Sequence, residues 1–353
     1  MILLRCDAST EIGTGHFFRL LSLGEYACER GVKAEIAMYR PPEGLVEQAD
    51  GLGLGVRRLE TEPGTNEEAK QLERWARLEG ARAVVVDGYH FPPSYYRALS
   101  GHRWTVTAID DIAHQPFPVD VLVNVNIDAE QLDYQTPPRT DRLLGIDYTL
   151  MRHQFRRKRK EIEESGGPEI PEQIEQILVF MGGSDPTDET TKVLKGLARA
   201  NYRGSVDVVI GASNPNEESI RRVGHQLETQ VCYHKNVSQM ANLIAGHHLS
   251  INAGGGTSWE MACLGVPMLQ IVVADNQADI VEGLDKRGIS TSLGWHEDVT
   301  PADIARAFRT SNTHPERRKR QVLQGMEKVD GRGVKRLLEH LLDLGDTDCS
   351  QEG

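Results

Sequence analysis

A histidine follows a glycine-rich segment near the N-terminus, in the stretch DASTEIGTGHFFR. The preceding residues ILLRC predict a strand that ends at Cys6, and the next helix is expected to begin near His16. At a helix N-terminus the dipole favours a neutral imidazole, which can accept a proton from water. We therefore predict that His16 is a general base. The alternative is that His16 only caps the helix or packs against the loop.

Two glycines in the same segment, Gly13 and Gly15, are expected to let the loop double back and a ligand approach closely. The G-T-G-H order has no third glycine, and no Lys-Ser/Thr pair follows it. The segment therefore matches neither a dinucleotide fingerprint nor a Walker loop, and we predict no cofactor.

Acidic and aromatic residues end two neighbouring predicted strands, with Asp87 and Tyr89 in VVVDGYH, and Asp110 and Asp111 in AIDDIA. Ligands in open α/β sheets bind at this edge, so these side chains could contact a ligand or orient His16. Strand ends also carry Asp simply for turn geometry. Both interpretations stay open.

Arg152 is expected to pair with a diphosphate. The basic run that follows it, residues 156–160, is predicted to be a solvated linker instead.

Glycine-rich turns follow two predicted strands in the second half. MGGSDPTDETT contains Gly182 and Gly183, and NAGGGTSWE contains Gly255 and Gly256. Such turns expose N–H groups toward a phosphate, and the dipole of the following helix adds to the attraction. Each turn could equally be a tight connection without a ligand.

Polar side chains next to these turns complete the predicted binding residues. They are Thr257, Ser258, Glu260, Asn276 and Gln277. A carboxylate such as Glu260 can accept both ribose hydroxyls, or can stabilise the helix dipole. The amides of Asn276 and Gln277 could meet a sugar or phosphate, or cap a helix.

Short apolar runs alternate with amphipathic stretches along both halves, which predicts two parallel sheets covered by helices. The series is interrupted after Tyr148 by a charged stretch with Gly and Pro and then begins again. We predict a first Rossmann-like domain over residues 1–150, a linker over 151–175, a second Rossmann-like domain over 176–345 and a tail over 346–353.

The chain of 353 residues has a formal net charge of −12, which argues against a nucleic-acid partner. Five cysteines without a C-x-x-C pair indicate neither a disulfide framework nor a zinc site. No carboxylate or histidine cluster stands out, so no metal is predicted. Because no apolar run reaches membrane-spanning length, a cytoplasmic location is expected, while the oligomeric state stays open.

The stretch LRCDASTEIGTGHFFRLLSL resembles the opening motif of the PseG family of UDP-sugar hydrolases and of its SpsG-type spore-coat polysaccharide relatives. The resemblance continues in order through VVVDGYH, AIDD, LVNVN, YTLMRHQF, ILVFMGGSDPTDET, NAGGGTSWEMACLGVP and DNQ, and covers about residues 1–290. Several short motifs in series are more specific than any one of them.

This resemblance implies an α/β fold of GT-B type, with two Rossmann-like doubly wound domains facing across a cleft. It implies a metal-independent, inverting hydrolase in which His16 activates water against the anomeric carbon of a UDP-linked deoxy-acetamido sugar. The residues matching Arg152, Glu260 and Asn276 would contact the nucleotide or sugar. The pathway would make pseudaminic-acid-like or surface polysaccharide sugars.

One departure concerns the order Asp87, Gly88, Tyr89, His90, where the family often has D-H-Y-G. This departure bears on the identity of the sugar. Two other functions stay open: a GT-B glycosyltransferase with a UDP-sugar donor, and a catalytically silent sugar-nucleotide binding protein.

Overall fold

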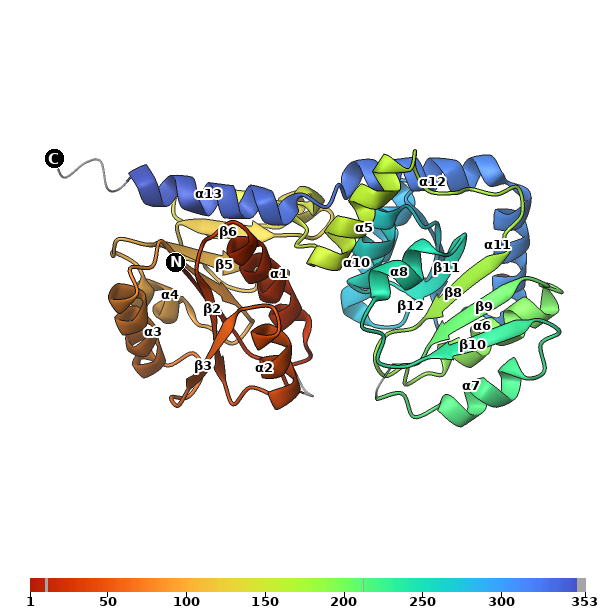
Figure 1. The fold of residues 1–353 in the computed structure, drawn as a ribbon, viewed down its shortest axis with the longest axis horizontal. Coiled ribbons are helices and arrows are strands. Elements are labelled where there is room, and N and C mark those ends of the chain that lie inside the picture. The colour runs from red at the N-terminus through yellow and green to blue at the C-terminus, as the bar shows by residue number, and fades with distance from the viewer. Residues whose placement is uncertain (10–11, 212, 348–353) are drawn as a thin grey trace. The chain divides into compact units, whose positions relative to one another are not determined.

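The computed structural model describes residues 1–9, 12–211 and 213–347. The chain divides into two compact units: Met1–His153 together with the C-terminal segment from Gly331, and Gln154–Asp330 (Figure 1).

The first unit contains a seven-stranded parallel sheet of order β3-β2-β1-β4-β5-β6-β7. Its strands are β1 Ile2–Cys6, β2 Ala34–Tyr39, β3 Gly55–Leu59, β4 Ala83–Asp87, β5 Thr105–Ile109, β6 Val121–Asn124 and β7 Asp141–Leu144. Its helices are α1 Gly15–Glu29, α2 Glu43–Asp50, α3 Asn66–Leu78, α4 Pro93–Leu99 and α13 Gly333–Thr347, with 3-10 turns η1 Ala129–Gln131 and η2 Ile146–Tyr148.

Strand β1 is buried along its whole length, because helices cover both faces of the sheet. Ile2 and Leu4 pack in a core cluster that includes residues of α1, whereas Leu3 packs on the opposite face in a cluster that includes residues of α3 and α4. The alternation of side chains along a strand explains this division.

The second unit contains a six-stranded parallel sheet of order β10-β9-β8-β11-β12-β13. Its strands are β8 Gln176–Phe180, β9 Ser205–Val209, β10 Gln230–His234, β11 Leu249–Ala253, β12 Met268–Val272 and β13 Ser290–Trp295. Its helices are α6 Glu189–Arg199, α7 Glu217–Gly224, α8 Met240–Ala245, α9 Thr257–Leu264, α10 Asp275–Lys286, α11 Pro301–Thr313 and α12 Pro315–Lys328, and α5 His153–Glu164 leads into them.

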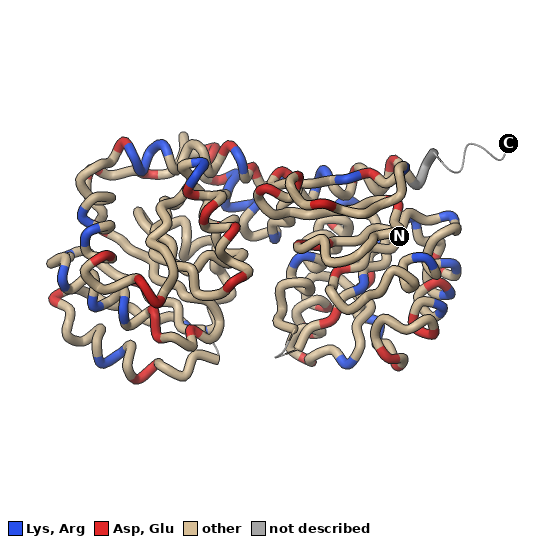
Figure 2. The backbone as a smooth tube through the Cα atoms, turned by 180° about the vertical axis from the view of Figure 1, so that it is seen from behind, with Lys and Arg blue, Asp and Glu red and all other residues tan. Residues whose placement is uncertain are grey.

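Helix α5 occupies residues where the sequence predicted a linker. Ion pairs at i,i+4 spacing join Arg157 to Glu161 and Arg159 to Glu163, and such pairs stabilise a helix. Lys and Arg alternate with Asp and Glu on outer helices of both units (Figure 2). The basic run is therefore mostly paired, and Arg159 is buried.

The last helix, α13, belongs to the first unit, although its residues were predicted to close the second domain. Val334, Leu337, Leu338 and Leu341 are buried in the same core cluster as residues of α1 (Figure 1). The apolar stripe of α13 therefore covers one face of the first sheet. Chain order alone does not reveal which sheet such a stripe will cover.

Both sheets reverse their strand order at one place, between β1 and β4 in the first unit and between β8 and β11 in the second. Ligands of doubly wound sheets bind at this switch point, at the carboxyl ends of the strands. Within the described residues, no helix is long and apolar enough to span a membrane.

Candidate active site

His16 and Asp87 meet at the switch point of the first sheet. Asp87 is the last residue of β4 and pairs in register with Cys6 of β1, while His16 is the second residue of α1. The His16 Nδ1 atom lies 2.7 Å from Asp87 Oδ1. Asp87 is fully buried, and His16 is 6% exposed.

The tautomer of His16 follows from this contact. An ionised carboxylate can only accept hydrogen bonds, so Nδ1 must carry the proton and donate it to Asp87. The Nη2 atom of Arg19 also lies 2.8 Å from Nδ1, but it donates to Asp87 Oδ1 at 2.7 Å. In the neutral ring, Nε2 is therefore the unprotonated nitrogen that can act as a base.

Arg19 connects Asp87 to a second carboxylate. Its Nη1 atom donates to both oxygens of Asp111, at 2.8 and 2.7 Å. Asp111 also accepts hydrogen bonds from the Tyr89 hydroxyl at 2.7 Å and from Asn126 Nδ2 at 3.0 Å.

The charges of this cluster determine two pKa shifts. Burial opposes ionisation of Asp111, but the Arg19 guanidinium outweighs it and holds the pKa of Asp111 below its ordinary value. Burial, with the adjacent Asp111 carboxylate, raises the pKa of Tyr89. Asp111 is therefore ionised and Tyr89 is a neutral donor. The Tyr89 ring also packs edge-on against His16, with centroids 4.9 Å apart.

Asp110 has a different role from its neighbour. Its Oδ2 atom accepts the N–H groups of Ile112 and Ala113, at 2.9 and 2.6 Å, and the hydroxyl of Tyr134 at 2.9 Å. Asp110 is buried, so it shapes the turn after β5.

A second histidine–carboxylate pair lies at the end of β1. His90 Nε2 is 3.0 Å from Asp7 Oδ2, and Arg5 donates to both Asp7 oxygens. Burial opposes ionisation of Asp7, but the bonds from His90, Arg5 and the Tyr39 N–H outweigh it and lower the pKa to about 2. His90, the histidine in the atypical position after Tyr89, therefore contacts the carboxylate of Asp7 at the end of β1.

The glycines before His16 leave space around the loop. Gly13 has φ of 80° and donates its N–H to Ser9 O at 2.9 Å. A Cβ atom at Gly13 or Gly15 would meet no atom within 4 Å. A substrate can therefore approach the backbone here. Arg152 lies in the same unit, with its guanidinium 5.4 Å from the centre of the Phe18 ring.

The glycine turns of the second unit follow β8 and β11, which are neighbours at its switch point. Gly182 has φ of 86°. A Cβ atom at Gly182, Gly183, Gly255 or Gly256 would meet open space. These turns, at the carboxyl edge, suit a ligand that contacts backbone N–H groups.

Only some of the predicted polar residues of the second unit present their side chains at the carboxyl edge of its sheet. Thr257 and Glu260 lie in the first turn of α9, and Asn276 in the first turn of α10 is exposed. Ser258 is fully buried, and its hydroxyl accepts a hydrogen bond from Gln270 at 2.7 Å. Gln277 accepts the Val273 N–H with its side chain. The Ser258 side chain therefore serves packing.

Three possible metal ligands come together in the first unit. Ligand atoms of Glu25, Glu29 and His153 all lie within 4.8 Å of one another, and this is the one such group among the described residues. Glu25 also accepts the His153 N–H at 2.9 Å, which caps the start of α5. Sequence spacing did not reveal this group, since 124 positions separate Glu29 from His153.

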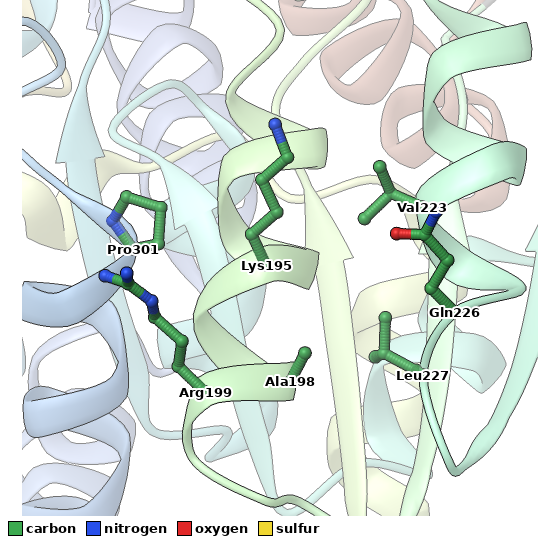
Figure 3. Close-up of a pocket in the computed structure, with 7 residues that line it drawn as sticks. All are labelled: Lys195, Ala198, Arg199, Val223, Gln226, Leu227 and Pro301. Carbon is green, nitrogen blue, oxygen red and sulfur yellow. The ribbon is translucent and has the colours of Figure 1, made fainter.

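A cavity of about 380 Å³ lies on the second unit, beside the C-terminal half of α6. It is lined by Lys195, Ala198, Arg199, Val223, Gln226, Leu227 and Pro301 (Figure 3). The Gly182 turn precedes the other end of α6, so this cavity is separate from the predicted nucleotide-binding turns.

Sequence reasoning did not select Arg19 or Asn126 as site residues, and it did not distinguish Asp111 from Asp110. A signal for Arg19 exists, because a residue three positions after His16 lies on the same face of the helix. Asp111 and Asn126 follow β5 and β6, so the approach of Asp111 to Arg19 and of Asn126 to Asp111 depends on strand order.

No protein-family model matches the chain. An uncharacterized protein of Methanocaldococcus jannaschii is 22% identical over 84% of this chain and 62% of its own length. The spore coat polysaccharide biosynthesis protein SpsG of Bacillus subtilis is 27% identical over 57% of this chain and 58% of its own. The chain thus spans less than two thirds of either protein. The UDP-2,4-diacetamido-2,4,6-trideoxy-beta-L-altropyranose hydrolase of Campylobacter jejuni is 22% identical over 81% of this chain and 97% of its own.

Solved structures with the same fold match nearly the whole chain. Acinetobacter baumannii MurG has a TM-score of 0.68 at 13% identity, over 97% of this chain and 99% of that one. Neisseria meningitidis UDP-GlcNAc 2-epimerase has a TM-score of 0.65 at 14% identity, over 97% and 100%. The predicted GT-B type architecture of two Rossmann-like domains is thereby confirmed. The chain has a GT-B type fold and is a distant relative of a UDP-sugar hydrolase and of a spore coat polysaccharide biosynthesis protein.

Proposed function

We propose that this protein hydrolyses a UDP-activated deoxy-acetamido sugar at the anomeric C–O bond and releases UDP and the free sugar. The product would enter the synthesis of a pseudaminic-acid-like or surface polysaccharide sugar. The observation that carries the proposal is the 2.7 Å contact of His16 Nδ1 with Asp87, which leaves Nε2 as a base at the switch point. The distant similarity to the Campylobacter hydrolase supports this choice of reaction.

In the proposed reaction, the oxygen of a water molecule attacks the anomeric carbon while His16 Nε2 takes one of its protons. The bond between that carbon and the β-phosphate oxygen breaks, and its electron pair leaves with UDP. A single displacement inverts the anomeric configuration. The Asp87 carboxylate stabilises the imidazolium that forms, and the proton then passes to solvent.

The leaving group requires little assistance, because UDP is a stable dianion or trianion at neutral pH. Backbone N–H groups of the glycine turns and Arg152 would hold its phosphates. Glu260 would accept the ribose hydroxyls, and Asn276 would contact the nucleotide or sugar.

Exposed side chains with apolar surface lie in loops at the carboxyl edge of the first sheet and suit the sugar. Ile12, Tyr89 and Ile112 are 45%, 46% and 53% exposed, and they lie in the loops that follow β1, β4 and β5. Exposed apolar groups at a polar site favour a ligand with methyl groups, as a deoxy-acetamido sugar has.

Release of UDP from candidate UDP-sugars, followed by NMR without an acceptor and in the presence of EDTA, tests the proposal. We expect turnover with inverted configuration in the natural protein, and loss of at least about 10³-fold in His16→Gln with UDP affinity unchanged. Turnover only with an added acceptor would indicate a glycosyltransferase. Binding without turnover of any deoxy-acetamido sugar would indicate a silent binding protein, and loss of activity with EDTA would contradict metal independence.

A further inference from the structure

The guanidinium of Arg19, next to His16, forms ion pairs with two carboxylates. Arg19 Nε and Nη2 donate to the two oxygens of Asp87, at 2.9 and 2.7 Å, and Nη1 donates to both oxygens of Asp111. The Arg19 side chain is 19% exposed and the Asp87 side chain is fully buried. The contact with Asp87 is bidentate, with two guanidinium nitrogens on two oxygens, whereas Asp111 shares the single Nη1 atom between its oxygens.

The net charge of Arg19, Asp87 and Asp111 suits a neighbouring histidine that acts as a base. Arg19, Asp87 and Asp111 together carry a net charge of −1 while His16 is neutral, and the cluster becomes neutral when His16 accepts a proton. Without Arg19 the two carboxylates would carry −2, and their attraction would favour the charged imidazolium form of His16. With Arg19 but without Asp111, the charges of Arg19 and Asp87 would cancel, and the imidazolium would be less stabilised.

The groups that face His16 come from several elements. They are Arg19 on the same helix, Asp87 at the end of β4, the Tyr89 ring in the next loop, and Asp111 after β5. Tyr89 donates its proton to Asp111 and contributes no charge. The net charge beside His16 therefore depends on the Arg19 cation and on the Asp87 and Asp111 anions.

We propose that Arg19 is the positioning residue of the base: by sharing its charge between Asp87 and Asp111, it keeps His16 as the neutral Nδ1–H tautomer in the resting protein. This inference rests on the proposed function in taking His16 as the base. The tautomer itself can be observed without any substrate.

Long-range nitrogen–proton NMR on the full-length protein with labelled histidines tests this inference, and His16→Gln identifies the His16 signals. In the natural protein His16 is expected as the Nδ1–H tautomer at neutral pH. In Arg19→Gln, which loses the cation, the pH at which His16 titrates should rise by at least about one unit. In Asp111→Asn, which loses an anion, it should fall. Arg19→Lys should restore most of the natural behaviour.

The opposite directions separate positioning from a structural role, since damage to the fold would affect both variants alike. Arg30→Gln, at the end of the same helix, is the matched control and should leave His16 unchanged. If Arg19→Gln does not fold, the downward shift in Asp111→Asn decides the question. If the pH at which His16 titrates is unchanged in Asp111→Asn and in a folded Arg19→Gln, the inference is overturned. If the shifts occur but no UDP-sugar is hydrolysed, the proposed function fails while the role of Arg19 stands.

Discussion

Asp87 lies 2.7 Å from His16 although 71 positions separate the two residues in the chain. The contact exists because β1 and β4 are neighbours in the sheet and because α1 begins just after the β1 loop. It turns a histidine at a helix start into an oriented imidazole with a defined tautomer.

Replacement of Asp87 by Asn should abolish this orientation. An amide can donate to Nδ1 as well as accept from it, so the ring can adopt the wrong tautomer. We expect kcat for UDP-sugar hydrolysis to fall by about 10² to 10⁴ with UDP affinity within about twofold of the natural protein. Steady-state kinetics and titration calorimetry measure the two quantities. A fall in kcat of less than tenfold would argue against the dyad.

Neighbouring glycines in the β11 turn allow a matched pair of substitutions. In Gly255→Ala the new methyl group enters open space, so the fold should persist. Because the methyl group would occupy the approach of a phosphate to the backbone, UDP should bind at least about tenfold more weakly. Unchanged UDP affinity in this variant would exclude the turn from the nucleotide site.

Gly254→Ala is expected to act differently. Its Cβ atom would lie 2.1 Å from Val281 Cγ2, so α10 or the turn must shift. We expect a loss of about 1–3 kcal/mol in the free energy of unfolding. Denaturant unfolding followed by circular dichroism provides the measurement. An unchanged midpoint would show that the turn accommodates the methyl group without loss of stability.

Arg159 should be important for the stability of the second unit. It donates to the carbonyl oxygens of Cys263 and Met326 at 2.8 and 2.9 Å, and it is buried. Arg159→Met would leave buried carbonyl groups without a donor, so we expect the free energy of unfolding to fall by about 2–4 kcal/mol. Arg157→Met, on the exposed face of the same helix, is the control and should cost less than about 0.5 kcal/mol. Equal effects of the two variants would refute this assignment.

Acid should weaken the first unit through Asp7. The pKa of Asp7 is about 2 in the folded protein against an ordinary value of 3.8, so the carboxylate stabilises the fold above about pH 4. This contribution, of about 2 kcal/mol, is lost as the pH falls toward 2. Asp7→Asn should therefore be less stable than the natural protein at pH 7, with a smaller difference at pH 2. Thermal unfolding across this range, with Asp50→Asn as an exposed control, provides the test.

Much of the architecture follows from local chemistry. Alternating apolar runs and amphipathic stretches led to two parallel α/β sheets, and the helix after Gly13 begins at Gly15, as the order of strand, glycine loop and apolar helix residues requires. The open glycine turns after β8 and β11 were likewise visible in sequence, and at Gly182 a φ of 86° favours glycine.

Tertiary structure decided which distant side chains meet. Periodicity shows which face of an element is buried, but not which element covers it, so α13 was assigned to the wrong sheet by chain order and Arg159 was taken as solvated. Strand order 3-2-1-4-5 brings Asp87 to His16 and Asp111 to Arg19, while Asp110, one residue away, turns into the loop. Adjacent residues of a chain point in different directions, and the neighbours they find depend on pairing between segments that only the folded chain brings together.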